Sequence, residues 1–283
     1  MSGKNKGSGF FSKLLTVLIV ALLVVCGYCI YNIVVTKADL SSQEKLFDDY
    51  RSLVKSVDDD SSAEETSTQE SDDMEQSESS TSEESSGKSK KRKSTHDYSD
   101  VYAMNSDFVG WITVKNTNID YPVVQTPDEP EYYLRRDLNG DYATAGTCFV
   151  GDCCDVDSTS FVIYGHNMNN DTMFGTLDYY KEEDFYKENP TFEFNTMNED
   201  RTYRVFAAFE ISIYDSEFKY FACVGDLDEE AYGEFIDNCK SYSMYDTGET
   251  PEYDTQILML STCSYHTDGG RFVVAAYLAD EDE

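Results

Sequence analysis

The sequence predicts a mainly β domain, folded as a closed or nearly closed barrel and preceded by a single membrane-spanning helix. Three observations support this: an uncharged apolar segment near the N-terminus, short β-prone runs separated by turns in the second half of the chain, and two helix-like segments among those runs. Regular spacing of short strands favours a barrel over a parallel α/β sheet. The expected strands are 109–114, 119–124, 146–150, 160–164, 203–213, 256–262 and 271–278, and the expected helices between them are 172–180 and 228–240.

The apolar segment covers residues 14–35 and contains no charged side chain. Its 22 residues exceed the ~20 that a helix needs to cross a bilayer. Residues 1–13 carry lysines and no acidic side chain, so we expect them to be cytoplasmic and the rest of the chain to be extracellular. The chain is therefore predicted to be a single-pass protein of the cell membrane.

Two connecting segments are predicted between the span and the domain. Residues 36–57 repeat apolar side chains near the helical spacing, which predicts an amphipathic helix beside the membrane; a stalk or a dimerisation helix would show the same pattern. Residues 58–95 are Ser-rich and acidic, then basic over 88–93, and cannot bury a core. We expect a disordered linker that holds the domain off the membrane. The basic run is interpreted as solvated, or as attracted to anionic wall polymers or to the acidic domain itself.

Residues 96–283 are expected to form one domain, which is long enough to enclose a hydrophobic core. Ser94 or Thr95 is expected to cap a short helix that runs through about Ser106. The helix predicted over 228–240 begins with acidic residues and ends with a lysine, as the helix dipole favours. The net charge of −33 argues against nucleic acid as a partner.

The hairpin predicted near the C-terminus brings a thiol and a guanidinium together. A short polar segment containing Asp-Gly-Gly separates its two β-prone runs. Cys263 ends the first run and Arg271 begins the second, so both lie at the same end of the sheet. A permanent cation lowers the pKa of a nearby thiol and stabilises a developing oxyanion. His166, which follows the strand predicted over 160–164 and a glycine, is the expected proton carrier.

The other histidines and cysteines are interpreted as structural. His266, between Cys263 and Arg271, is expected to be a hydrogen-bonded structural residue, and His96 at the domain edge is expected to be inert. No metal or cofactor is expected, because the spacing of the cysteines near His166 matches no common zinc pattern. An extracellular location permits disulfides, but small buried apolar residues are the simpler interpretation. The cysteines that could pair include Cys148, Cys153, Cys154, Cys223 and Cys239, of which Cys148, Cys223 and Cys239 are interpreted as small buried residues.

Three motifs occur in one order along the domain. They are residues 110–125 followed by Tyr133-Leu134, residues 164–168 (Tyr-Gly-His-Asn-Met), and residues 260–263 (Leu-Ser-Thr-Cys) followed by Arg271. Together they resemble the sortases, cysteine transpeptidases of Gram-positive bacteria, and the class B sortases in particular. The resemblance implies a closed β-barrel of about eight strands with peripheral helices, one of them inserted between the sixth and seventh strands.

The resemblance also implies roles for single residues. Cys263 would be the nucleophile, His166 the acid and base, and Arg271 the ligand of the substrate carbonyl or oxyanion. Leu134, Ser261 and Thr262 would line the substrate groove. Two departures from the family pattern are Met259, where a threonine is usual, and Glu129-Pro130, where class B relatives have Asp-Asn. The usual motif preference of the family is therefore not carried over to this chain.

The implied function is that of a membrane-anchored transpeptidase of the cell wall. It would cleave a Thr-containing sorting motif in secreted surface proteins and transfer the acyl group, through a thioester on Cys263, to an amine of a peptidoglycan precursor. Two alternatives stay open from the sequence. One is a cysteine hydrolase that uses the same residues with water as the acceptor. The other is a non-enzymatic, wall-associated scaffold protein.

Overall fold

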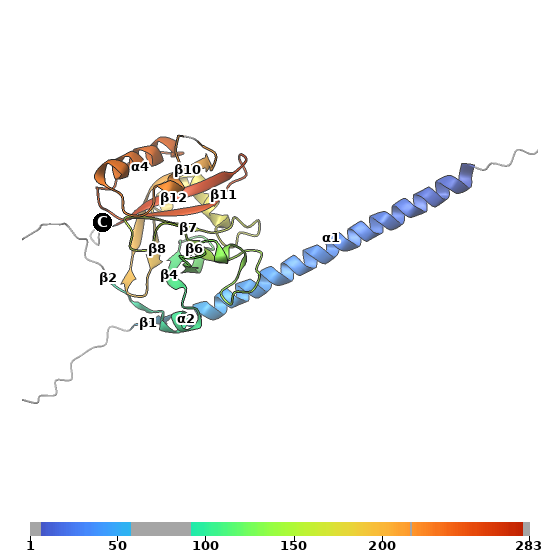
Figure 1. Ribbon diagram of the computed structural model, residues 1–283, viewed down its shortest axis with the longest axis horizontal. Helices are drawn as coiled ribbons and strands as arrows, with labels where there is room; N and C mark the ends of the chain where they lie inside the picture. Colours follow the sequence, from blue (N-terminus) through green and yellow to red (C-terminus); the bar gives the residue numbers. More distant parts are fainter. Residues whose placement is uncertain (1–6, 58–91, 216, 280–283) are drawn as a thin grey trace, which may run out of the picture.

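The computed structural model describes residues 7–57, 92–215 and 217–279, and its folded domain is built around a closed barrel of eight strands, with α1 extending away from it (Figure 1). The strands follow the order β10-β12-β11-β7-β6-β5-β4-β8 around the barrel. The predicted mainly β fold is confirmed. The barrel strands are β4 (Phe108–Thr113), β5 (Asp120–Val124), β6 (Cys148–Val150), β7 (Ser160–Tyr164), β8 (Thr191–Asn195), β10 (Thr202–Ser212), β11 (Ile257–Cys263) and β12 (Gly270–Leu278).

Helices and short strand pairs surround the barrel. The α-helices are α1 (Gly7–Arg51), α2 (Ser99–Met104), α3 (Glu183–Glu188) and α4 (Glu229–Tyr242). The 3-10 helices are η1 (Tyr132–Arg135), η2 (Gly175–Lys181) and η3 (Tyr220–Ala222). Two antiparallel pairs lie outside the barrel: β1 (Lys55–Ser56) with β3 (His96–Asp97), and β2 (Arg92–Lys93) with β9 (Glu199–Asp200).

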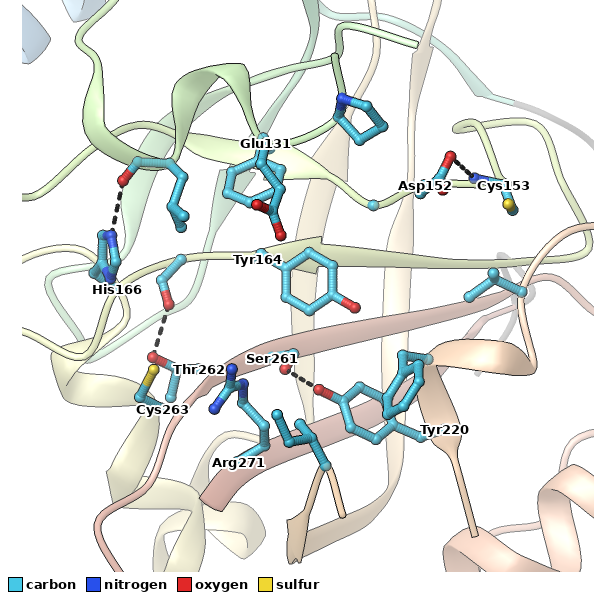
Figure 2. Close-up of a pocket in the computed structure, with 18 of the residues that line it drawn as sticks. Glu131, Asp152, Cys153, Tyr164, His166, Tyr220, Ser261, Thr262, Cys263 and Arg271 are labelled. Carbon is cyan, nitrogen blue, oxygen red and sulfur yellow. Dashed lines mark hydrogen bonds between the residues drawn. The ribbon is translucent and has the colours of Figure 1, made fainter. Parts of the chain in front are cut away.

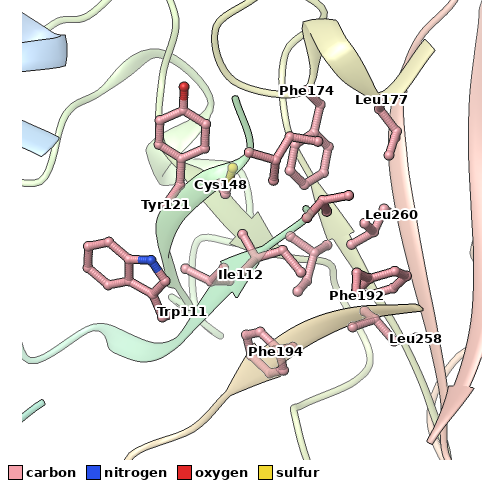
Figure 3. Close-up of a cluster of buried hydrophobic side chains, with 14 of the residues drawn as sticks. Trp111, Ile112, Tyr121, Cys148, Phe174, Leu177, Phe192, Phe194, Leu258 and Leu260 are labelled. Atoms are coloured by element: carbon pink, nitrogen blue, oxygen red, sulfur yellow. The ribbon is translucent and has the colours of Figure 1, made fainter. Parts of the chain in front are cut away.

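The strands around β11 are apolar throughout because both of their faces are covered. Leu258 and Leu260 point into the barrel, where they meet the aromatic side chains of β8 (Figure 3). Ile257 and Met259 point outward into a second layer beneath α4. Met259 is fully buried there, so it is a packing residue. A strand covered on both faces reads as a continuous apolar run, which is why this one was visible in the sequence.

Helix α4 agrees with its prediction within two residues. Asp228 caps it by accepting a hydrogen bond from the backbone N–H of Ala231 at 2.9 Å, and acidic residues fill the first turn. One face of the helix buries Tyr232, Phe235 and Ile236 against the outer side of β10 (Figure 1). It lies between β10 and β11 in the chain, as the resemblance implied.

Three local predictions were wrong. Strand β8 was not predicted, because residues 191–195 hold only two apolar side chains; it closes the barrel by pairing with both β4 and β10. The helix predicted over 172–180 is the 3-10 helix η2. Ser94 and Thr95 cap no helix, because both hydroxyls donate to Asp200, at 2.9 and 2.6 Å respectively.

Helix α1 joins the predicted membrane span to the barrel without a break. Within the described residues it is the one helix long and apolar enough to cross a membrane, over Lys13–Arg51. The helix predicted over residues 36–57 is the end of α1 as far as Arg51, followed by a turn and by β1, and it packs one face on the barrel. Phe47 and Tyr50 are each 1 % exposed, and the ring of Phe47 meets that of Tyr121 edge-on at 5.0 Å.

Polar contacts support this docking of α1. The side chain of Gln43 donates to the carbonyl of Gly146, and Asp39 accepts a hydrogen bond from the backbone N–H of Thr144 at 2.9 Å. At the end of the helix, Arg51 donates to the carboxylate of Asp120 at 2.5 Å. The barrel is thus fixed to the helix at several points.

The expected linker has a different place in the fold from the one predicted. Strand β1 precedes it and pairs with β3, which follows it. Residues 58–91 lie outside the described residues, but the chain leaves and returns at neighbouring positions on the domain. The linker therefore does not separate the domain from α1.

Replacing Phe47 with alanine is expected to destabilise the docked domain by about 3–5 kcal/mol, because it removes a fully buried ring and leaves a cavity beside Tyr121. The free energy of unfolding of the full chain in detergent would be measured by urea denaturation. Lys45→Ala, on the exposed face of the same helix, is the matched control and should change it by less than ~0.5 kcal/mol. Equal unfolding midpoints for the two variants would contradict the docking of α1.

Candidate active site

The three predicted catalytic side chains lie on neighbouring elements at one end of the barrel. Cys263 is the last residue of β11, and its antiparallel partner in β12 is Arg271. Strand β7 runs parallel to β11 and pairs Tyr164 with Ser261. His166, two residues beyond Tyr164, therefore lies beside Cys263, two residues beyond Ser261. Figure 2 shows the three side chains along one cleft.

The cleft has a volume of about 690 Å³ and is lined by Cys263, His166 and Arg271. Leu134, Ser261 and Thr262, the positions expected in a substrate groove, also line it. Pro130 contributes to the wall, whereas its neighbour Glu129 does not. The lining residues that the sequence did not point to include Glu131, Phe149, Asp152, Cys153, Tyr164 and Tyr220.

His166 is held through one ring nitrogen. Its Nε2 lies 2.8 Å from the backbone oxygen of Leu134. A carbonyl oxygen can only accept, so Nε2 carries the proton and Nδ1 of the neutral ring is left to accept one. Burial lowers the pKa of His166 below its ordinary value; the positive charges of Arg135 and Arg271 act in the same direction, and the Leu134 hydrogen bond opposes them. The imidazole is therefore predominantly neutral at pH 7 and able to take a proton.

The side chains of Ser261 and Thr262, which precede Cys263, are buried and form hydrogen bonds within the protein. The hydroxyl of Ser261, fully buried, lies 2.8 Å from that of Tyr220. The hydroxyl of Thr262, which is 2 % exposed, donates to the backbone oxygen of Gly165 at 2.7 Å. Cys263 itself is half-buried and opens into the cleft. Both residues line the cleft, but their burial leaves little side-chain surface for a substrate to contact.

The guanidinium of Arg271 lies beside Cys263 (Figure 2). It donates one hydrogen bond, at 3.0 Å, to the backbone oxygen of Gly270. Arg271 forms no ion pair with any residue in the described parts of the chain. Its remaining N–H groups are therefore available to an oxygen in the cleft. A thiol, a neutral imidazole and an available guanidinium together form the set that acyl transfer requires.

The other histidines lie outside this cleft. Nδ1 of His266 is 3.0 Å from the hydroxyl of Ser264, and His96 stacks on Tyr98 at the edge of the domain. No group of three possible metal ligands occurs among the residues that the structure describes. Cys148 and Cys239 are buried, as expected, whereas Cys223 is only half-buried, and all eight cysteines are free thiols.

The cleft residues missed by the sequence come from long connections. Tyr220 and Phe221 belong to η3, between β10 and α4, and no periodicity marks that segment. Asp152 and Cys153 lie between β6 and β7. Tyr164 could have been found, because it belongs to the strand that leads to His166.

Comparison with known proteins gives one family. A model of the sortase domain matches residues 112–279. Sortase B of Listeria monocytogenes is 30% identical over 184 residues, which cover 63% of this chain and 72% of the relative. Sortase B of Staphylococcus aureus is 27% identical over 183 residues, covering 63% and 73%.

Solved structures give the same result. That of Clostridium perfringens sortase B is similar with a TM-score of 0.58 and 29% identity, covering 64% of this chain and 98% of that one. Sortase B of Bacillus anthracis in complex with AAEK1 has a TM-score of 0.57 and 30% identity, covering 65% and 84%.

Proposed function

The chain belongs to the sortase family of cysteine transpeptidases, and from this premise we propose that it cleaves a Thr-containing sorting motif in secreted proteins and joins the new acyl end to a peptidoglycan amine. The observation that supports this most directly is the meeting of Cys263, His166 and Arg271 in one cleft. Its similarity to class B sortases supports attachment of proteins to the cell wall as the task.

In the proposed first half-reaction, the thiolate of Cys263 attacks the carbonyl carbon of the motif threonine. His166 accepts the thiol proton at Nδ1, the nitrogen left open by the Leu134 hydrogen bond. The carbonyl oxygen becomes an oxyanion, which Arg271 stabilises with its uncommitted N–H groups. The C–N bond then breaks, and His166 returns its proton to the leaving amine. A thioester on Cys263 remains.

In the second half-reaction, the acceptor amine attacks the thioester carbon, and His166 takes one proton from that amine. Arg271 stabilises the second oxyanion in the same way. When the C–S bond breaks, the protein substrate leaves with a new amide bond, and the proton returns to the sulfur of Cys263. Leu134, Ser261 and Thr262 are proposed to contact the motif from the walls of the cleft.

The chain is proposed to work at the outer face of the cell membrane. Residues 14–35 would anchor it, with residues 1–13 inside and the barrel outside. The exposed apolar side chains on the first part of α1 support this arrangement, since nothing in the described parts of the chain covers them. The docking of α1 on the barrel would hold the cleft close to the membrane.

A panel of quenched fluorescent peptides with different Thr-containing motifs tests this proposal. The full chain in detergent and its Cys263→Ala variant would each be incubated with the panel, with and without an added amine. We expect cleavage by the unmodified chain alone, with the amine found on the new threonine carboxyl group. Cleavage without amine capture would support the hydrolase alternative. If no peptide is cleaved and Cys263→Ala leaves wall association in cells unchanged, the scaffold alternative replaces the proposal.

A further inference from the structure

Two side-chain hydrogen bonds connect the segment that carries His166 with the strand that carries Cys263, and they run in opposite directions. Thr262, just before Cys263, donates from Oγ1 to the backbone oxygen of Gly165 at 2.7 Å. Asn167, just after His166, donates from Nδ2 to the backbone oxygen of Cys263 at 2.9 Å. One bond lies on each side of the His166–Cys263 pair.

We propose that Thr262 and Asn167 are positioning residues: their reciprocal hydrogen bonds fix the imidazole of His166 at reacting distance from the thiol of Cys263. This inference rests on the proposed function, and it adds a positioning role for residues on either side of the reacting pair. Thr262 would thus position the reacting pair in addition to lining the substrate groove.

The backbone beside His166 is held equally closely. The N–H of Gly165 donates to the oxygen of Ser261 at 3.2 Å, which extends the pairing of β7 with β11 by one residue. The oxygen of His166 accepts from the N–H of Phe174 at 2.9 Å. A Cβ on Gly165 would lie 2.6 Å from the ring of Phe174, so a glycine is required at that contact. The Thr262 bond completes the set by fixing the oxygen of Gly165.

The amide of Asn167 is oriented by a chain of charges behind it. Its Nδ2 also donates to Oδ2 of Asp178 at 3.3 Å. The other carboxylate oxygen of Asp178, Oδ1, lies 3.2 Å from the ammonium of Lys181. Lys181 is 2.9 Å from Glu210. Glu210 in turn accepts a hydrogen bond from Ser264, the residue that follows Cys263.

This series of charged and polar groups has two consequences for the residue at position 167. The charged groups come from η2 and β10, and the hydroxyl of Ser264, just after β11, binds the last of them, so these elements together support the carbonyl of Cys263. The side chain at 167 must also be a donor to both Cys263 and Asp178. A carboxylate there would have the size of asparagine, but it would repel Asp178 and could not bind the carbonyl.

Isosteric variants of the full chain test the proposal. Thr262→Val and Asn167→Asp keep the side-chain volume and remove the donor. Displacement of a reacting group by ~1 Å can cost ~100-fold, so we expect kcat to fall about 10- to 100-fold with little change in KM. Thr262→Ser, which restores the hydroxyl, should recover most of the rate.

A second readout does not depend on substrate. The alkylation of Cys263 by iodoacetamide would be followed by mass spectrometry at neutral and alkaline pH. If the imidazole no longer faces the thiol, the rate at neutral pH should fall relative to the rate at alkaline pH in both donor-deleted variants. This measurement would still report on the pair if the peptide panel identified no motif, so failure of the proposed function and failure of the positioning role are distinguishable.

Matched controls remove similar hydrogen bonds elsewhere. Thr247→Val deletes a 2.8 Å bond to the oxygen of Phe206, and Asn189→Asp deletes a 3.1 Å bond to that of Phe185. Each control should lower the midpoint of urea unfolding and leave both rates intact. The positioning role is overturned if Thr262→Val and Asn167→Asp lose only as much stability as their controls, with unchanged kcat and unchanged alkylation.

Discussion

Replacing Cys263 with alanine is expected to abolish both peptide cleavage and amine transfer, with a loss of more than ~10⁴-fold in kcat/KM. The sulfur is the atom to which the acyl group is proposed to bind, and nothing in the cleft can substitute for it beside His166. Cys263 is half-buried at the end of β11, and its side chain is small, so the fold should survive the change. Mass spectrometry of the chain with a cleavable peptide would show an acyl adduct in the unmodified protein and none in the variant.

Cys153 provides a matched control for this experiment, because its thiol lines the same cleft. The carboxylate of Asp152 raises the pKa of the Cys153 thiol, which disfavours the nucleophilic thiolate. Cys153→Ala should therefore change the rate by no more than a few-fold. An acyl adduct mapped to Cys153, together with full activity of Cys263→Ala, would move the nucleophile to that position and overturn the proposed assignment.

The sequence predicted secondary structure best where a run of apolar residues is compatible with only one kind of element. The C-terminal hairpin was predicted within one residue at each strand, because both faces of β11 and β12 are buried and both strands read as apolar runs. Strand β8 could not be recognised from a run of apolar residues, because its five residues alternate between apolar and polar side chains. Its place in the barrel depends on pairing with β4 and β10, which are distant in sequence.

Long-range contacts also explain what was missed near α1. The apolar positions of residues 36–57 indicated an amphipathic helix, which α1 forms as far as Arg51, but the pattern could not say what covers its apolar face. The covering surface is formed by β5 and by the loop of Thr144 and Gly146, about a hundred residues away. The reciprocal bonds of Thr262 and Asn167 were hidden for the same reason, because they join β11 to the end of β7.

Replacing Arg271 with alanine is expected to lower kcat/KM by about 100- to 1000-fold, because removal of one oxyanion donor costs ~3 kcal/mol. Arg271 faces Cys263 in register, and its guanidinium is not engaged by any carboxylate in the described parts of the chain. The donors would bind the oxyanion more strongly than the ground-state carbonyl, so the loss should fall mainly on kcat. Arg271→Lys keeps the charge but not the planar fork and should recover part of the rate.

The charge of Arg271 has a second, separable effect on His166. It contributes to lowering the pKa of His166, so its removal should raise that pKa and shift the imidazole titration, followed by NMR, to higher pH. Arg135 is the matched control: it also lowers the pKa of His166, but it donates to the oxygen of Thr144 and does not line the cleft. Arg135→Ala should therefore shift the titration in the same direction with at most a few-fold loss of kcat. If Arg135→Ala and Arg271→Ala lost equal activity, charge near His166 would explain the effect, and Arg271 would not be the oxyanion ligand.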